Sequence, residues 1–150
     1  MKIIIQRVSE ASVIIDKSVF SKINKGLLIL LGIGYDDTID DIIWLCNKVI
    51  NLRIFQDEND KMNLSLNDVN GDIIVVSQFT LMASTKKGNR PSYIKAAKPE
   101  ISIPLYNDFI SQLEKLLSKK VGTGIFGADM KVQLINDGPV TIEINSKNRV

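Results

Sequence analysis

The segment Gly26–Ile33, GLLILLGI, is a nearly continuous apolar run and decides the fold class. A run this short predicts a strand that is buried on both faces. Three shorter runs rich in β-branched residues precede it, at residues 2–8, 12–16 and 18–23, with only one to three residues between them. This spacing predicts a meander of strands that the buried strand continues.

Two helices are predicted farther along the chain, where apolar residues recur every three or four positions. Thr38 and Asp41 resemble a capping box at the start of the first. The apolar residues of this helix are Ile39, Ile42, Ile43, Cys46, Val49 and Ile50. Pro104 is expected to open the second helix, which would end near Lys119 and Lys120. Its inner face would carry Leu105, Phe109, Leu113 and Leu116.

The last part of the chain is expected to return to strands. Residues 132–135 and 140–144 alternate between apolar and polar on either side of Asn136-Asp137-Gly138-Pro139, which predicts two strands joined by a tight connection. The predicted class is therefore α+β. Residues 1–150 would form a single domain, with a mostly antiparallel, curved or barrel-like sheet and two main helices packed on it.

Composition excludes several kinds of protein. The chain has 150 residues, 45% of them apolar, but no uninterrupted apolar run of the ~18 to 20 residues that a membrane helix requires. Cys46 is the only cysteine and histidine is absent, which removes disulfides, zinc clusters and Ser-His or Cys-His pairs. The net charge of +2 is too small for a protein that coats nucleic acid. We expect a cytoplasmic protein that binds neither membranes nor DNA.

Three local patterns are interpreted as structural. Asp57 to Lys61 lacks the glycine and distal glutamate of a calcium loop and is expected to be a solvated turn. Gly122 to Gly127 matches GxGxxG, but a helix precedes it and a strand follows, the reverse of a dinucleotide site. Its glycines are expected to permit close approach of the backbone. Cys46 is expected to be a core residue. No metal or cofactor is predicted.

Polar residues follow the buried run that begins at Ile73, in the segment Ser77-Gln78-Phe79-Thr80-Leu81. One interpretation is a strand end whose hydroxyls bond to the local backbone. The other is a set of fixed backbone N–H donors that stabilise an oxyanion. A basic loop, residues 85–93, comes next in sequence. It carries Lys86, Lys87 and Arg90, which are typical of phosphate contacts if the neighbouring segment is a functional site.

Six segments together closely resemble the D-aminoacyl-tRNA deacylase family. They match it in order and spacing and cover nearly the whole chain, from Met1 to about Ile144. Two of them, residues 77–81 and 136–141, lie about sixty residues apart and make the resemblance specific. The other segments are Gln6 to Val8, Lys61 to Leu64, Arg90 to Ser92 and Gly127 to Met130.

The resemblance implies a homodimeric hydrolase that cuts the ester joining a D-amino acid or glycine to tRNA. Ser77, Gln78, Phe79 and Thr80 would form the catalytic floor, with the backbone amides of Phe79 and Thr80 as oxyanion donors. The dipeptide Gly138-Pro139 would be the family's cis-proline motif, reaching from one subunit into the active site of its partner and rejecting L-amino acids. Arg7 would hold that motif through its carbonyls, and Met130 would contact the substrate.

Two other functions remain open from the sequence. A non-catalytic RNA-binding module would have the same basic loop and would need no general base. A hydrolase acting on another ester would use Thr80 as a covalent nucleophile and form an acyl-enzyme. Thr80 has no histidine or lysine beside it in the motif, so hydrolysis assisted by the ribose 2′-hydroxyl of the tRNA is preferred.

Overall fold

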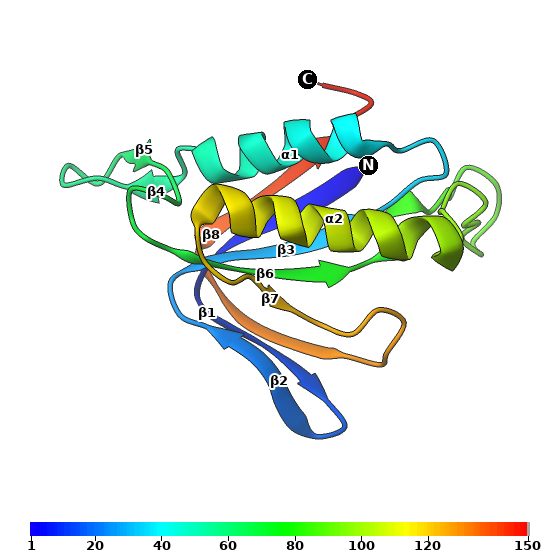
Figure 1. The fold of residues 1–150 in the computed structure, drawn as a ribbon, viewed down its shortest axis with the longest axis horizontal. Coiled ribbons are helices and arrows are strands. Elements are labelled where there is room, and N and C mark those ends of the chain that lie inside the picture. The colour runs from blue at the N-terminus through cyan, green and yellow to red at the C-terminus, as the bar shows by residue number, and fades with distance from the viewer. Residues whose placement is uncertain (150) are drawn as a thin grey trace.

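A computed structural model describes residues 1–149 and has two helices on one face of a strongly curved sheet (Figure 1). The strands of this sheet are β1 (Lys2–Ile15), β2 (Ser18–Ile23), β3 (Gly26–Gly32), β6 (Asp72–Ser77), β7 (Gly122–Thr123) and β8 (Lys131–Asn145). The helices are α1 (Ile39–Asn51) and α2 (Pro99–Leu117). A small hairpin is formed by β4 (Phe55–Gln56) and β5 (Met62–Leu64), and a 3₁₀ turn, η1 (Phe79–Met82), follows β6.

The sheet is mixed, with strand order β2-β1-β3-β6-β7 and with β8 paired to β1. Strand β1 is antiparallel to β2, β3 and β8, whereas β3, β6 and β7 run parallel. A parallel neighbour needs a crossover connection. Helix α1 lies in the crossover from β3 to β6, and α2 in the crossover from β6 to β7 (Figure 1). The α+β class with a mostly antiparallel sheet and two helices is confirmed.

Strand β3 is the centre of the fold because both of its faces are covered. Leu27 and Ile29 are fully buried in the cluster beneath the helices, and Leu28 is buried in a second cluster on the opposite face. The first cluster includes Leu45 and Cys46 of α1 and Phe109 and Leu113 of α2. Burial raises the pKa of the Cys46 thiol to about 12, so Cys46 is the core residue that its apolar spacing predicted.

Two predicted strand breaks are wrong. Residues 2–8 and 12–16 lie mostly in one strand, β1, and residues 132–135 and 140–144 both lie in β8. The two halves of β8 pair with the same strand, since Gln6 is opposite Thr141 and Val8 is opposite Asn136. The Asn136–Pro139 segment is therefore not a hairpin turn but part of a bulge in a continuous strand, facing Arg7.

The start of the second helix was also predicted wrongly. Helix α2 begins at Pro99, and Pro104 lies inside it. The backbone N–H groups of Ile101 and Ser102 both bond to the Lys98 carbonyl at 2.9 Å, which establishes the first turn before Pro104. Tyr106 joins Phe109 and Leu113 on the buried face, while Leu105 and Leu116 are only partly buried.

The capping box of α1 and the Asp57 turn are confirmed. The backbone N–H of Thr38 donates to the Asp41 carboxylate at 2.8 Å. The Asp57 carboxylate accepts bonds from the N–H groups of Asn59 and Lys61 at 2.8 and 3.1 Å. Residues 1–149 contain no cluster of three or more side chains suited to a metal ion. The same residues form no helix long and apolar enough to cross a membrane.

Candidate active site

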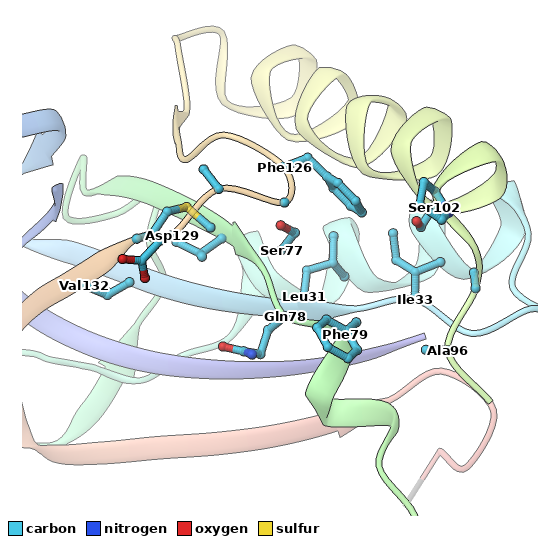
Figure 2. A pocket seen from close by; sticks show the side chains of 16 residues that line it. Leu31, Ile33, Ser77, Gln78, Phe79, Ala96, Ser102, Phe126, Asp129 and Val132 are labelled. Carbon is cyan, nitrogen blue, oxygen red and sulfur yellow. The ribbon is translucent and has the colours of Figure 1, made fainter. Parts of the chain in front are cut away.

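A cavity of about 520 Å³ opens where β3 and β6 end. Figure 2 shows Phe126 and Ser102 on one side of it and Leu31, Ile33 and Phe79 on the other. The remaining walls come from the β6 end, the residues before α2 and the segment before β8, which contribute Val76, Ser77, Gln78, Ala96, Ala97, Pro99, Gly127, Ala128, Asp129, Met130 and Val132. Most of these side chains are apolar, which suits a site that excludes water from a substrate.

The floor of the cavity forms because β6 stops pairing at Ser77. The N–H of Gln78 bonds to the Leu31 carbonyl at 2.7 Å, and the chain then turns into η1. Within this turn, Leu81 N–H donates to Gln78 and Ala83 N–H donates to Thr80. The N–H groups of Phe79 and Thr80 donate to no other group in residues 1–149. The first N–H groups of any helical turn lack partners within that turn, so two fixed donors remain at the rim.

The side chains of the floor include no general base. Ser77 lines the cavity and is half-buried. The amide of Gln78 donates to the Thr80 hydroxyl oxygen at 2.5 Å. Thr80 itself is exposed and does not line the cavity. Thr80 therefore accepts a hydrogen bond but has no neighbouring group that takes its proton, an arrangement typical of a positioning side chain rather than a nucleophile.

The opposite wall is built on the segment Gly122–Met130. A Cβ on Gly124 would collide with the Met130 sulfur, so the predicted close approach of the glycine backbone is confirmed. Tyr106 supports this wall: its hydroxyl donates to the Val75 carbonyl at 2.7 Å, and its ring packs edge-on against Phe126 at 6.0 Å. Burial raises the pKa of Tyr106 to about 12, so the hydroxyl stays protonated and keeps donating.

Gly138, Pro139 and Arg7 lie away from the cavity of their own chain, at the bulge between β1 and β8. The Gly138-Pro139 peptide bond is cis, and both residues are exposed. Arg7 is only 4% exposed. It donates to the Asp137 carbonyl at 2.9 Å and to the Ile54 carbonyl at 2.6 Å. The bulge is thus held through the residue before Gly138.

The basic residues predicted to bind RNA do not line the cavity. Lys86, Lys87 and Arg90 are exposed, in a loop closed by two backbone bonds between Ser84 and Ser92 of 2.8 and 3.0 Å. This loop follows η1 directly, so the positive charges lie beyond the rim that carries the two N–H donors.

Several cavity residues were missed from the sequence. Phe126 and Ser102 are brought to the site by the loop after β7 and by the first turn of α2. Phe126 lies inside the GxGxxG match, where an aromatic residue among glycines was the available signal. Ser102 carried no signal, because the helix was expected to begin after it.

Comparison with known proteins places these features in one family. The family model described as D-Tyr-tRNA(Tyr) deacylase matches residues 4–145. A D-aminoacyl-tRNA deacylase of Flavobacterium psychrophilum is 70% identical over 149 residues, covering 99% of both chains. One of Flavobacterium johnsoniae is 65% identical with the same coverage.

Solved structures give the same fold. One titled c-Myc DNA Unwinding Element Binding Protein has a TM-score of 0.92 and 41% identity, covering 97% of this chain and 98% of that one. A second, described as a probable eukaryotic D-amino acid tRNA deacylase, has a TM-score of 0.83 at 14% identity, covering 95% and 97%. At that identity the second structure supports the fold alone.

Proposed function

The chain belongs to the D-Tyr-tRNA(Tyr) deacylase family, and on this premise we propose that it hydrolyses the ester of D-aminoacyl-tRNA and of mischarged glycyl-tRNA. The products are the free amino acid and tRNA. The structural observation that carries the proposal is the pair of free N–H donors, Phe79 and Thr80, at the rim of an apolar cavity. Such a substrate is found where translation takes place, so we propose that the protein acts in the cytoplasm.

The chemistry needs little from side chains. An aminoacyl ester is an activated acyl group, so holding it beside oxyanion donors and a water molecule accelerates its hydrolysis. Water adds to the carbonyl carbon, the N–H groups of Phe79 and Thr80 stabilise the oxyanion, and the bond to the ribose oxygen breaks. The ribose 2′-hydroxyl of the substrate orients the water. The cavity beside Phe126 and Met130 accommodates the terminal adenosine that carries the ester.

Rejection of L-amino acids is assigned to Gly138 and Pro139 of a partner subunit. Within one chain the two residues are exposed and lie away from the cavity, which supports a site completed by a second copy. If their carbonyls face the α-carbon of the substrate, an L side chain meets backbone, whereas a D side chain points outward. Buried Arg7 supports this role because it fixes the bulge at Asp137.

The partner is proposed to be an identical chain related by a twofold axis. In such an isologous dimer each bulge enters the cavity of the other subunit, which gives two equivalent sites. Exposed apolar side chains on β2 and β8, Val19, Phe20 and Ile135, support a contact surface on this part of the molecule. Lys86, Lys87 and Arg90 are proposed to contact tRNA phosphates near the ester, which positions the RNA without reading its sequence.

The first prediction concerns stereochemistry. Purified protein without added metal is expected to release the amino acid from D-aminoacyl-tRNA and glycyl-tRNA, and to leave the matched L-aminoacyl-tRNA largely intact. The reason is that the donors serve any ester, whereas the bulge obstructs only one enantiomer. Release of labelled amino acid measures both rates. Equal rates on the two enantiomers would contradict the role of Gly138-Pro139.

The same assay separates the proposed enzyme from its rivals. A non-catalytic RNA-binding module would bind tRNA and release no amino acid. A covalent hydrolase would accumulate an acyl adduct on Thr80. Because one relative in structure carries a DNA-binding title, duplex DNA is a useful competitor. It is expected to inhibit weakly, since a site built around an unpaired 3′ end does not fit a duplex.

A second prediction concerns Thr80. Thr80→Ala is expected to lower kcat by no more than about tenfold, because it removes one hydrogen bond, with Gln78, and no nucleophile. Single-turnover kinetics on D-aminoacyl-tRNA measure the effect, with Thr80→Val as a control that keeps the shape. Complete loss of activity, together with an acyl adduct on Thr80 of the parent protein by mass spectrometry, would establish the covalent route instead.

A further inference from the structure

We propose that the rings of Phe79 and Tyr93 form a stacking platform for an unpaired nucleotide that precedes the terminal adenosine of the substrate. This rests on the function proposed above and assigns a further part of the RNA. The two rings are 5.0 Å apart between centroids and inclined by 71°, a T-shaped pair. Phe79 also lines the cavity, so the pair sits on its rim.

Exposure distinguishes this pair from a core contact. The side chain of Phe79 is 55% exposed and that of Tyr93 is 38% exposed. Aromatic side chains usually bury their area, and rings that stay open beside a cavity mark a binding surface. The ring contact fixes the two side chains relative to each other, so a stacked base loses little entropy from the protein.

The backbone beneath the rings is held from several directions. Phe79 is the first residue of η1, which Gln78 ties to Leu31. Tyr93 directly follows Ser92, whose two bonds with Ser84 close the basic loop, and its carbonyl accepts the N–H of Ala96 at 2.9 Å. The platform is therefore carried by a braced loop rather than a free one.

The surrounding charge selects the occupant. Lys86, Lys87, Arg90 and Lys95 are all exposed in the segment that carries Tyr93. Open aromatic rings together with basic side chains are the usual means of binding single-stranded nucleic acid, in which bases stack and phosphates pair with cations. A peptide or a second subunit would not require this density of positive charge. The aminoacylated end of tRNA is single-stranded, and its nucleotides precede the ester that the cavity holds.

The test compares two substrates that share the ester but differ in length, D-aminoacyl-tRNA and 3′-(D-aminoacyl)adenosine. Tyr93→Ala is expected to raise KM for the tRNA about 5- to 150-fold, the loss of one stacked base, with kcat preserved. The adenosine ester has no preceding nucleotide, so its kcat/KM is expected to stay within twofold. Tyr93→Phe keeps the ring and is expected to behave as the parent. Ile94→Ala is the matched control, because Ile94 is 84% exposed in the same loop and has no ring.

Each contrary result has a distinct meaning. An equal loss on both substrates would make Tyr93 a structural support for Phe79, and a lower dimer mass by light scattering would make the surface a subunit contact. An unchanged KM for tRNA would also overturn the platform while leaving the proposed function intact. If the parent fails to hydrolyse D-aminoacyl-tRNA, the function fails, and fluorescence anisotropy then tests the platform directly. Uncharged RNA ending in CCA should still bind about 5- to 150-fold more weakly to Tyr93→Ala, and equal binding would overturn the proposal.

Discussion

Phe79→Pro is expected to lower kcat on D-aminoacyl-tRNA about 100- to 1,000-fold, the usual effect of removing one oxyanion donor. Proline lacks the backbone N–H, and its φ suits the first residue of a helical turn, which is the position of Phe79. The preceding residue, Gln78, has φ −144° and ψ 80°, outside the helical region that proline disfavours before it. The substitution therefore removes the donor without an evident clash in the turn.

Phe79→Ala is the matched control, because it removes the same ring but keeps the N–H. It is expected to affect mainly KM, through the cavity rim and the stacking platform, and to leave kcat within about tenfold of the parent. Thermal unfolding of both variants checks that the turn still forms. If the proline and alanine variants have the same kcat, the Phe79 N–H is not an oxyanion donor.

The second large effect is expected at Gly138. Its φ is +134°, and a Cβ placed there would lie 2.9 Å from Nη2 of Arg7 and 2.9 Å from a methyl of Val140. Arg7 cannot easily move aside, since it is buried and bonded to two carbonyls. Gly138→Ala is expected to shift the bulge and to lower kcat/KM about 100-fold, the cost of a misplacement near 1 Å.

Folding is expected to weaken as well, by about 1 to 3 kcal/mol for the strained backbone. Gly88→Ala serves as the stability control: Gly88 also has a positive φ, +67°, but no atom lies within 4 Å of the added Cβ. Chemical denaturation measures both variants. A Gly138→Ala protein that equals the parent in activity and stability would show that the bulge does not depend on this glycine.

Mixed dimers test whether the site is shared. Neither Phe79→Pro nor Gly138→Ala should be active alone, but an exchanged mixture should recover about a quarter of the parent activity. Half of the dimers are then mixed, and in each of these both lesions fall in one site and leave the other intact. Verified exchange without any recovery would show that each bulge does not serve the cavity of its partner.

Local patterns in the sequence were enough to predict α1, the buried strand β3 and the polar turn at residues 77–81. In each, the deciding signal lies within a few residues: the capping box at Thr38, the unbroken apolar run, and the change from Val76 to Ser77. The resemblance to the family supplied what local patterns lacked, namely the link between that turn and Gly138-Pro139.

Features that depend on distant partners were not predictable in this way. Ser9 and Glu10 are exposed polar residues that suggested a break, yet pairing with β8 carries β1 through them. Arg7 resembled a surface charge, but its acceptors are 47 and 130 residues away in the chain. Asn136–Pro139 has the composition of a hairpin, and only the common pairing of both flanks with β1 makes it a bulge.

The bulge in β8 also has an evolutionary consequence. Because Thr141 to Asn145 and Lys131 to Asn136 are each anchored to β1 by their own ladder, the register on one side does not depend on the other. Residues added to or deleted from the bulge would change its reach without sliding either half of the strand. The segment proposed to judge the chirality of the substrate can thus be lengthened, shortened or exchanged as a separate module, on a scaffold that does not need to be rebuilt.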